Sequence, residues 1–127
     1  MTEVIVVIPT KDRPEFLIKA LTSVASQTPR PSRLIVVGAS ETDMELEQRM
    51  RNEVKNYDGK RTVWIKNSHA DNLSGSLNTA LAYLLENGTD PEITYVAFLD
   101  DDDTWEPDYL EKCLGAALES NSDMVIA

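Results

Sequence analysis

The chain is poor in the residues that build disulfide scaffolds and metal clusters. Its 127 residues include one cysteine, Cys113, and one histidine, His69. A single cysteine excludes an internal disulfide and is typical of a reducing compartment. His69 has no second histidine or cysteine at metal-binding spacing, so we expect a plain loop histidine. Cys113 lies among apolar residues, and we expect it to be a small buried core residue.

Basic residues are also scarce. Lys and Arg number 12 against 22 Asp and Glu, which gives a formal net charge of −10. Nucleic-acid binding needs a basic face, so this balance argues against nucleic acid as the main partner. It does not exclude a nucleotide, because a bound metal ion can reverse the local sign of the charge.

Long apolar runs are missing as well. No stretch approaches the ~20 residues that cross a bilayer, and Thr2 and Glu3 stand where the basic start of a secretory signal belongs. We therefore predict a cytoplasmic chain without a membrane span of its own, whose parent protein could still lie on the cytoplasmic face of a membrane. With 42% hydrophobic residues, residues 1–127 are enough for one domain with a core.

Short β-branched or apolar runs alternate with segments of helical period. Strands are predicted at 4–8, 34–37, 62–65 and 95–99, and helices are predicted to follow from Pro14, from Thr42 or Asp43, from Leu73 and from Pro107. Pro9 is expected to end the first strand, and 95–99 is expected to be buried on both faces. The alternation predicts an α/β fold: a mainly parallel sheet with helices on both faces. The apolar residues 124–127 suggest a fifth strand just beginning, so we expect a chain truncated at its C-terminus.

Four consecutive aspartates follow the strand expected at 95–99: Asp100, Asp101, Asp102 and Asp103. Like charges about 4 Å apart repel by roughly 4 kcal/mol at an effective dielectric near 20, so folding alone gives no reason to crowd them. Hard divalent cations bind carboxylate oxygens, and the run therefore predicts a metal site that positions a phosphate-bearing ligand. Alternation along an extended strand would put Asp100 and Asp102 on the same side. The alternative is a solvated acidic loop before a helix.

Ligands of open parallel sheets bind beyond the carboxyl ends of the strands. The loops 9–13, 38–43 and 100–105 are therefore expected to meet. The first two offer hydroxyls, small residues and backbone amides, and the third offers the acids. Lys11 and Arg13 could steer a diphosphate or be ordinary surface charges, and Trp105 is expected to pack below the acids.

The sequence resembles the N-terminal, nucleotide-binding part of the inverting glycosyltransferases of family 2, which have the GT-A fold. Four segments carry the resemblance in the family's order, at 8–14, 23–28, 78–81 and 98–107, and the last contains the Asp-x-Asp pattern followed by Trp105 and Pro107. The resemblance implies a UDP- or GDP-sugar donor, Mn²⁺ or Mg²⁺, a glycan or lipid-linked acceptor, and a role in polysaccharide biosynthesis.

The resemblance also implies roles for single residues. Asp102 would bind the metal that bridges the diphosphate, and Asp100 would lie near the ribose or the metal. Thr10 would touch the nucleoside and Pro9 would shape the floor of the base pocket. The nucleotide-binding residues implied in this way are Pro9, Thr10, Asp12, Arg13, Gly38, Asp100 and Asp101.

The chain departs from the family's pattern after the second strand. An acidic pair usually stands there and its first acid commonly contacts the base, whereas this chain has Gly38 and Ala39. The base specificity is therefore open. Asp43 matches the acid that closes this segment, and a helix cap is its alternative role.

Inverting transfer needs a general base, which the family supplies from a later segment, so we expect it beyond Ala127. This chain alone should bind a donor without transferring sugar efficiently. Two other functions stay open: a non-catalytic nucleotide-binding module, and a Mg²⁺-dependent phospho-receiver domain. The receiver is disfavoured because its acidic pair follows the first strand.

Overall fold

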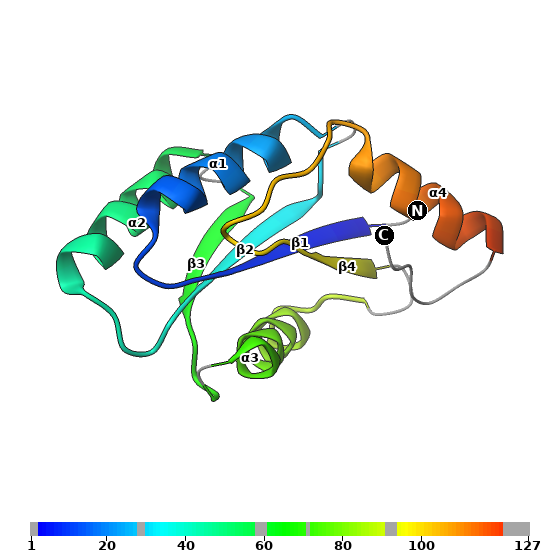
Figure 1. Cartoon of the computed structure of the whole chain (residues 1–127). Coiled ribbons are helices and arrows are strands. Elements are labelled where there is room, and N and C mark those ends of the chain that lie inside the picture. The colour runs from blue at the N-terminus through cyan, green and yellow to red at the C-terminus, as the bar shows by residue number, and fades with distance from the viewer. Residues whose placement is uncertain (1–2, 28–29, 58–60, 71, 91–93, 121–127) are drawn as a thin grey trace.

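A computed structural model describes residues 3–27, 30–57, 61–70, 72–90 and 94–120. The described strands form one parallel sheet in the order β3-β2-β1-β4. Helices α1, α2 and α4 lie over one face of this sheet, and α3 lies over the other (Figure 1). The strands are β1 (Glu3–Thr10), β2 (Arg33–Gly38), β3 (Thr62–Lys66) and β4 (Thr94–Phe98), and the helices are α1 (Pro14–Ala25), α2 (Met44–Tyr57), α3 (Leu73–Glu86) and α4 (Tyr109–Ser120). The predicted α/β fold with helices on both faces of a parallel sheet is confirmed.

The two central strands build a core on each face of the sheet. Side chains alternate along a strand, so Val6 and Ile8 pack with α1, α2 and α4 while Ile5 and Val7 pack with α3. All four side chains are fully buried. Burying each contributes about 1.5–3 kcal/mol, which makes β1 a rigid base for the loop that follows it.

The prediction that 95–99 is buried on both faces is wrong. Among the described strands, β4 pairs with β1 alone, and Phe98 is 40% exposed. Helix α3 packs against β1 and β2, so it leaves part of β4 uncovered. A run of apolar residues looks the same in the middle of a sheet and at its edge, so the sequence pattern could not separate the two.

Pro9 does not end β1. It pairs with Val37, and the strand continues to Thr10. In a parallel ladder, alternate residues point to the same neighbouring strand. Because the Val7 carbonyl accepts a hydrogen bond from Leu99, Pro9 also faces the β4 side, at a level where β4 has already ended. Its missing N–H therefore costs no ladder bond.

Two helix starts differ in how well they were predicted. Asp43 caps α2, since its Oδ1 accepts from the amides of Glu45 and Leu46 at 3.0 and 3.1 Å. Its predicted alternative role is therefore confirmed. Helix α4 begins at Tyr109, two residues after the predicted start at Pro107, because residues 106–109 first form a turn in which the Tyr109 amide bonds the Glu106 carbonyl.

The predicted inward faces of α3 and α4 need correction. Ala80 and Leu84 are buried in α3, whereas Leu81, which was expected to face inward, is exposed. In α4, Leu118 is likewise exposed and Cys113 is half-buried instead of buried. The helical period of the sequence predicts inward faces made of Leu77, Leu81 and Leu84 in α3 and of Leu110, Leu114, Ala117 and Leu118 in α4. Of these residues, Leu84, Leu110 and Ala117 are buried as predicted. The strand expected at 124–127 lies outside the described residues, and no helix in the described part of the chain combines the length and apolar character that crossing a membrane requires.

Candidate nucleotide-binding site

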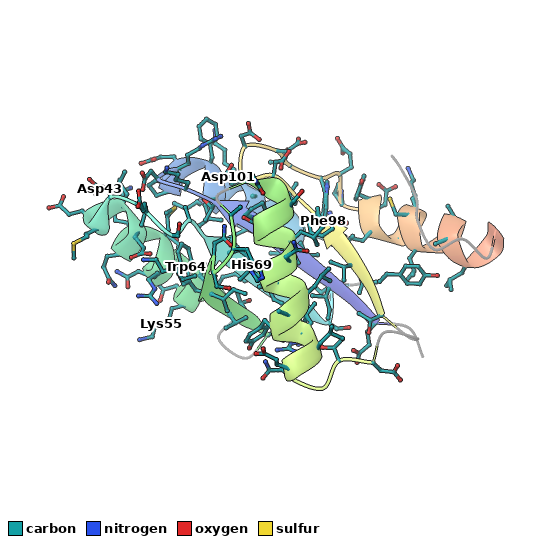
Figure 2. The ribbon with its side chains drawn as sticks, turned by 90° about the horizontal axis from the view of Figure 1, so that it is seen from below. Asp43, Lys55, Trp64, His69, Phe98 and Asp101 are labelled. Atoms are coloured by element: carbon teal, nitrogen blue, oxygen red, sulfur yellow. The ribbon has the colours of Figure 1, made fainter. Side chains whose placement is uncertain are left out.

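A cavity of about 260 Å³ opens at the carboxyl ends of the strands. It lies between the loop before α1, the segment after β4 and the first turn of α3, which Figure 2 shows close to Asp101. Its lining residues come from four separate parts of the chain: Pro9, Thr10, Lys11, Arg13, Ala39, Asn72, Ser76, Asp100 and Asp101. The loops after β1 and β4 thus meet, while the loop after β2 contributes Ala39 alone.

The four aspartates form a tight turn, which we call the acid turn (residues 100–103). The Asp103 amide donates to the Asp100 carbonyl at 3.1 Å, so the chain is not extended here. The prediction that side chains alternate, with Asp100 and Asp102 on one side, is therefore wrong. A run of like residues gives no periodicity from which such a turn could be recognised.

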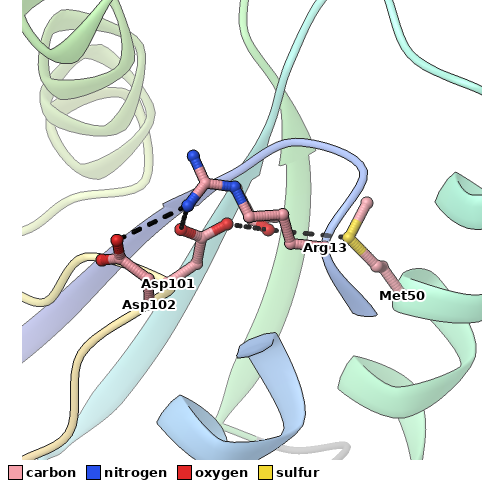
Figure 3. A network of polar contacts seen from close by, with 5 residues as sticks. Arg13, Met50, Asp101 and Asp102 are labelled. Carbon is pink, nitrogen blue, oxygen red and sulfur yellow. Dashed lines mark hydrogen bonds and ion pairs between the residues drawn. The ribbon is translucent and has the colours of Figure 1, made fainter. Parts of the chain in front are cut away.

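Asp101 is the buried member of the acid turn. Its side chain is 9% exposed, and its Oδ2 accepts a hydrogen bond from the Thr10 hydroxyl at 2.9 Å. The same hydroxyl lies 3.5 Å from Sδ of Met50 on α2 (Figure 3). This contact fixes the acid turn to the end of β1, where the rigid central strand positions Thr10.

Arg13 supplies positive charge to the acid turn. Its Nη1 lies 3.5 Å from Oδ1 of Asp101 and 3.6 Å from Oδ2 of Asp102, so one guanidinium faces both carboxylates (Figure 3). Two negative charges on adjacent residues repel each other, and a shared cation offsets that repulsion. Arg13 therefore stabilises the turn that the sequence alone could not explain.

Asp12 does not line the cavity. Its φ of 51° is left-handed, a conformation that aspartate tolerates better than most residues. Its Oδ1 accepts hydrogen bonds from the Thr42 hydroxyl and from the Asp43 amide. In this structure Asp12 joins the loop after β1 to the loop after β2, and its implied contact with a nucleotide stays a prediction.

Gly38 does not line the cavity either. A Cβ added to it would lie 2.1 Å from Cζ2 of Trp64, on the neighbouring strand β3. The Trp64 ring thus fills the space that a side chain at position 38 would need. An acid cannot fit there unless Trp64 moves, so the glycine at this position and the packing of Trp64 go together.

Asn72 and Ser76 also line the cavity, although no sequence motif predicted them there. Asn72 caps α3, since its Oδ1 accepts from the Gly75 amide at 2.7 Å. A Cβ on Gly75 would lie 1.7 Å from the Ala70 carbonyl oxygen, so glycine permits the close approach of the preceding loop. The polar, small residues at 72–76 were the available signal, because they open a helix that directly follows a loop at the carboxyl end of a strand.

Gln27 is a buried anchor for the segment after the acid turn. Its Nε2 donates to the Glu106 carbonyl at 2.7 Å, and its Oε1 accepts from the Leu110 amide at 3.0 Å. Trp105 stacks on Tyr109 with ring centroids 4.8 Å apart and packs against the core, so its predicted packing role is confirmed. Burial raises the pKa of the Tyr109 phenol, with a further contribution from its hydrogen bond to Cys113.

His69 takes part in a small polar network on the loop before α3. Its Nδ1 lies 2.9 Å from the Thr79 hydroxyl, and that hydroxyl donates to Oδ1 of Asn67 at 2.7 Å. The side chain is exposed, as expected of a loop histidine.

The acid turn offers an incomplete set of metal ligands. Within the described ranges, no three carboxylate, histidine or cysteine side chains converge on a common point where they could hold a metal. Asp101 and Asp102 do converge on one cation, the Arg13 guanidinium. Mg²⁺ is usually bound by one or two carboxylates together with substrate phosphates. The residues present therefore fit a divalent cation that shares its coordination with a bound phosphate group.

Three solved structures have a similar fold. The mannosyltransferase PcManGT from Pyrobaculum calidifontis, in complex with GDP-Man and Mn²⁺, has a TM-score of 0.70 at 18% identity over 91% of this chain. S. aureus TarS 1–349 gives 0.64 at 19% identity over 94%, and its complex with UDP-GlcNAc gives 0.60 at 20% identity over 94%. The chain spans about a third of each, 32%, 33% and 32% respectively. At these identities the likeness shows a shared fold.

No curated protein sequence matches the chain. The family model described as "Glycosyl transferase family 2", in contrast, matches residues 5–127. This match begins inside β1 and includes the cavity and the acid turn. Because it spans nearly the whole sequence, the chain belongs to glycosyl transferase family 2.

Proposed function

We propose that this chain binds the nucleoside diphosphate of a sugar donor through a divalent metal, as the donor-binding part of an inverting glycosyltransferase. The observation that carries the proposal is the polar network beside the cavity, in which Thr10 and Arg13 hold the acid turn through Asp101 and Asp102. Family membership supports the transferase class. The GDP-Man and Mn²⁺ of PcManGT and the UDP-GlcNAc of TarS support a nucleotide-sugar donor.

The proposed roles follow from position and charge. Asp102, more exposed than Asp101, would hold the cation together with the diphosphate oxygens. Asp100, which lines the cavity, would lie near the ribose or the metal. Bound Mn²⁺ or Mg²⁺ would stabilise the charge that grows on the departing nucleoside diphosphate. Lys11 and Arg13 bring positive charge to the same cavity, and Pro9 and Thr10 are proposed to contact the nucleoside.

The acceptor and the general base belong to the finer part of the proposal. We propose a glycan or lipid-linked acceptor, a cytoplasmic location, and a role in polysaccharide biosynthesis. The chain spans about a third of the length of the compared glycosyltransferases, and no residue of this chain is assigned as the base. Donor binding without efficient transfer is therefore the activity proposed for the chain by itself.

Calorimetry tests this proposal directly. UDP, GDP and dTDP are titrated into the chain with and without Mn²⁺, and at least one should bind more tightly with the metal. Asp102→Asn should lower the affinity in Mn²⁺ at least about tenfold, because a metal ligand is lost. Asp103→Asn is the matched control, since Asp103 is exposed and bonds the amide of Thr104. It should change the affinity less than about threefold.

Two results would contradict the proposal. Absence of binding to all three nucleotides in Mn²⁺ would exclude the donor site. Nucleotide binding that is unaffected by Mn²⁺, combined with an unchanged Mn²⁺ affinity in Asp102→Ala, would instead favour the non-catalytic nucleotide-binding module.

A further inference from the structure

Arg13 combines a fixed backbone with a movable side chain. Its carbonyl accepts the Leu17 amide at 3.0 Å in the first turn of α1. The preceding residue, Asp12, is tied by its carboxylate to the loop after β2. The Arg13 side chain, in contrast, is 49% exposed, and the described part of the chain gives it ion pairs with Asp101 and Asp102 alone. The guanidinium can therefore move while its backbone stays in place.

The two ion pairs of Arg13 are loose. Their N–O separations of 3.5 and 3.6 Å exceed the roughly 2.7–2.9 Å of a charge-assisted hydrogen bond. The pair with Asp102 joins two side chains that are each about half exposed, and an exposed ion pair contributes little to stability. A competing cation with higher charge therefore faces a small barrier to replacing the guanidinium.

The two carboxylates are held unequally. Asp101 is 9% exposed, and the Thr10 hydroxyl bonds it in addition to Arg13. Asp102 is 54% exposed, and among the described residues Arg13 is its one ion-pair partner. Removal of the guanidinium would leave Asp101 anchored but would free Asp102 for another cation.

We propose that Arg13 is a displaceable counter-ion of the acid turn. A divalent cation would displace its guanidinium from Asp102, and the guanidinium would then bind the diphosphate of the donor. This inference rests on the proposed donor site and gives Arg13 a positioning role within it. Without nucleotide, the cation and the guanidinium compete for the same carboxylates. With nucleotide, the five N–H donors of Arg13 gain phosphate oxygens as partners. Arg13 thus weakens the binding of metal alone and strengthens the coupling between metal and nucleotide.

The test measures Mn²⁺ affinity by calorimetry, first without nucleotide and then with saturating UDP or GDP. Arg13→Gln should bind Mn²⁺ alone about threefold to tenfold more tightly than the wild type, because the competing cation is gone. Its nucleotide affinity in Mn²⁺ should fall several-fold. Arg13→Lys keeps the charge, so its affinity for Mn²⁺ alone should stay within about twofold of the wild type.

Two further variants separate a specific contact from a general charge effect. Lys11→Gln removes a charge from the same cavity and should tighten Mn²⁺ binding less than about twofold. Arg33→Gln repeats the arginine-to-glutamine change of Arg13→Gln at the first residue of β2, at the opposite end of the sheet. It should leave Mn²⁺ affinity unchanged.

The possible failures are distinguishable. An unchanged or weaker Mn²⁺ affinity in Arg13→Gln would overturn the counter-ion role, and so would an equal gain in Lys11→Gln. If Arg13→Gln tightens Mn²⁺ binding but no nucleotide binds, the competition stands and the proposed function fails. If neither the wild type nor Arg13→Gln binds Mn²⁺, both proposals fail.

Discussion

The strands β1 and β2 lie side by side, but their carboxyl ends are built in opposite ways. The end of β1 is polar, with Thr10 hydrogen-bonded to Asp101 and Arg13 facing the acid turn. The end of β2 is closed by packing, because Trp64 occupies the space beside Gly38. The carboxyl end of β1 thus carries the charged groups that we propose to bind a metal and a diphosphate. The carboxyl end of β2 has no room for a carboxylate at position 38 that could contact a base.

The largest expected effect tests the closed end. Gly38→Asp forces a carboxylate against the Trp64 ring and buries its charge. Overpacking costs about 1–3 kcal/mol and a buried unpaired charge adds several more, so we expect a loss of at least about 4 kcal/mol in the free energy of unfolding. Urea denaturation measures it. Ala39→Asp is the matched control, because Ala39 lines the open cavity and should lose less than about 1 kcal/mol. Equal losses would show that Trp64 does not close this end.

The second-largest expected effect concerns Gln27, which anchors the segment after the acid turn. Gln27→Leu keeps a similar volume but leaves the Glu106 carbonyl and the Leu110 amide without their partner. The bond to the Leu110 amide is buried and the bond to the Glu106 carbonyl is part-buried. A buried group left unpaired costs about 1–3 kcal/mol and a part-buried one less, so we expect a loss of about 2–3 kcal/mol in denaturant unfolding. Gln27→Glu retains the oxygen that accepts from the Leu110 amide, but it places a second carboxyl oxygen opposite the Glu106 carbonyl. Its stability should fall with rising pH as the new carboxyl ionises.

The third effect concerns Thr10, whose hydroxyl anchors the acid turn itself. Thr10→Val is nearly isosteric and removes the hydroxyl that donates to Asp101, so we expect a loss of about 1–2 kcal/mol and a severalfold weaker nucleotide affinity in Mn²⁺. Thr10→Ser keeps the hydroxyl and should recover most of the affinity. If Val and Ser behave alike, the hydroxyl does not position the acid turn.

The sequence predicted the α/β alternation because β1 and β2 are continuous apolar runs followed by segments of helical period. Of the residues predicted to bind a nucleotide or metal, Pro9, Thr10, Arg13, Asp100 and Asp101 line one cavity, whereas Asp12, Gly38 and Asp102 do not. Their roles in binding stay predictions. What the sequence could not predict depends on contacts between segments distant in sequence. The exposure of β4 follows from its place at the edge of the sheet that the described strands form, and the closed end of β2 follows from Trp64 on a neighbouring strand.

The acid turn marks the same limit within the site. The aspartates were expected to alternate, whereas the bond between Asp103 and Asp100 makes a turn. Two residues from another segment, Thr10 and Arg13, then decide which of the acids is buried. Thr10 and Asp101 are 91 positions apart in the sequence. No local pattern contains that information.

The smallest expected effect comes from the solvent-exposed ion pair of Lys112 and Asp108. Nζ of Lys112 on α4 lies 2.9 Å from Oδ2 of Asp108, the residue before this helix, and Lys112 lowers the pKa of the Asp108 carboxyl mainly through their hydrogen bond. A carboxyl whose pKa is lowered on folding contributes stability above its unfolded pKa and loses it as the pH falls through the folded pKa. Lys112→Gln should therefore lower the melting temperature less than any variant above, and the difference should vanish in acid. Both side chains of this pair are solvent-exposed, whereas Asp101 is buried beside Arg13. A loss in Lys112→Gln as large as that in Thr10→Val would therefore mean that burial does not distinguish the acid turn from an ordinary surface pair.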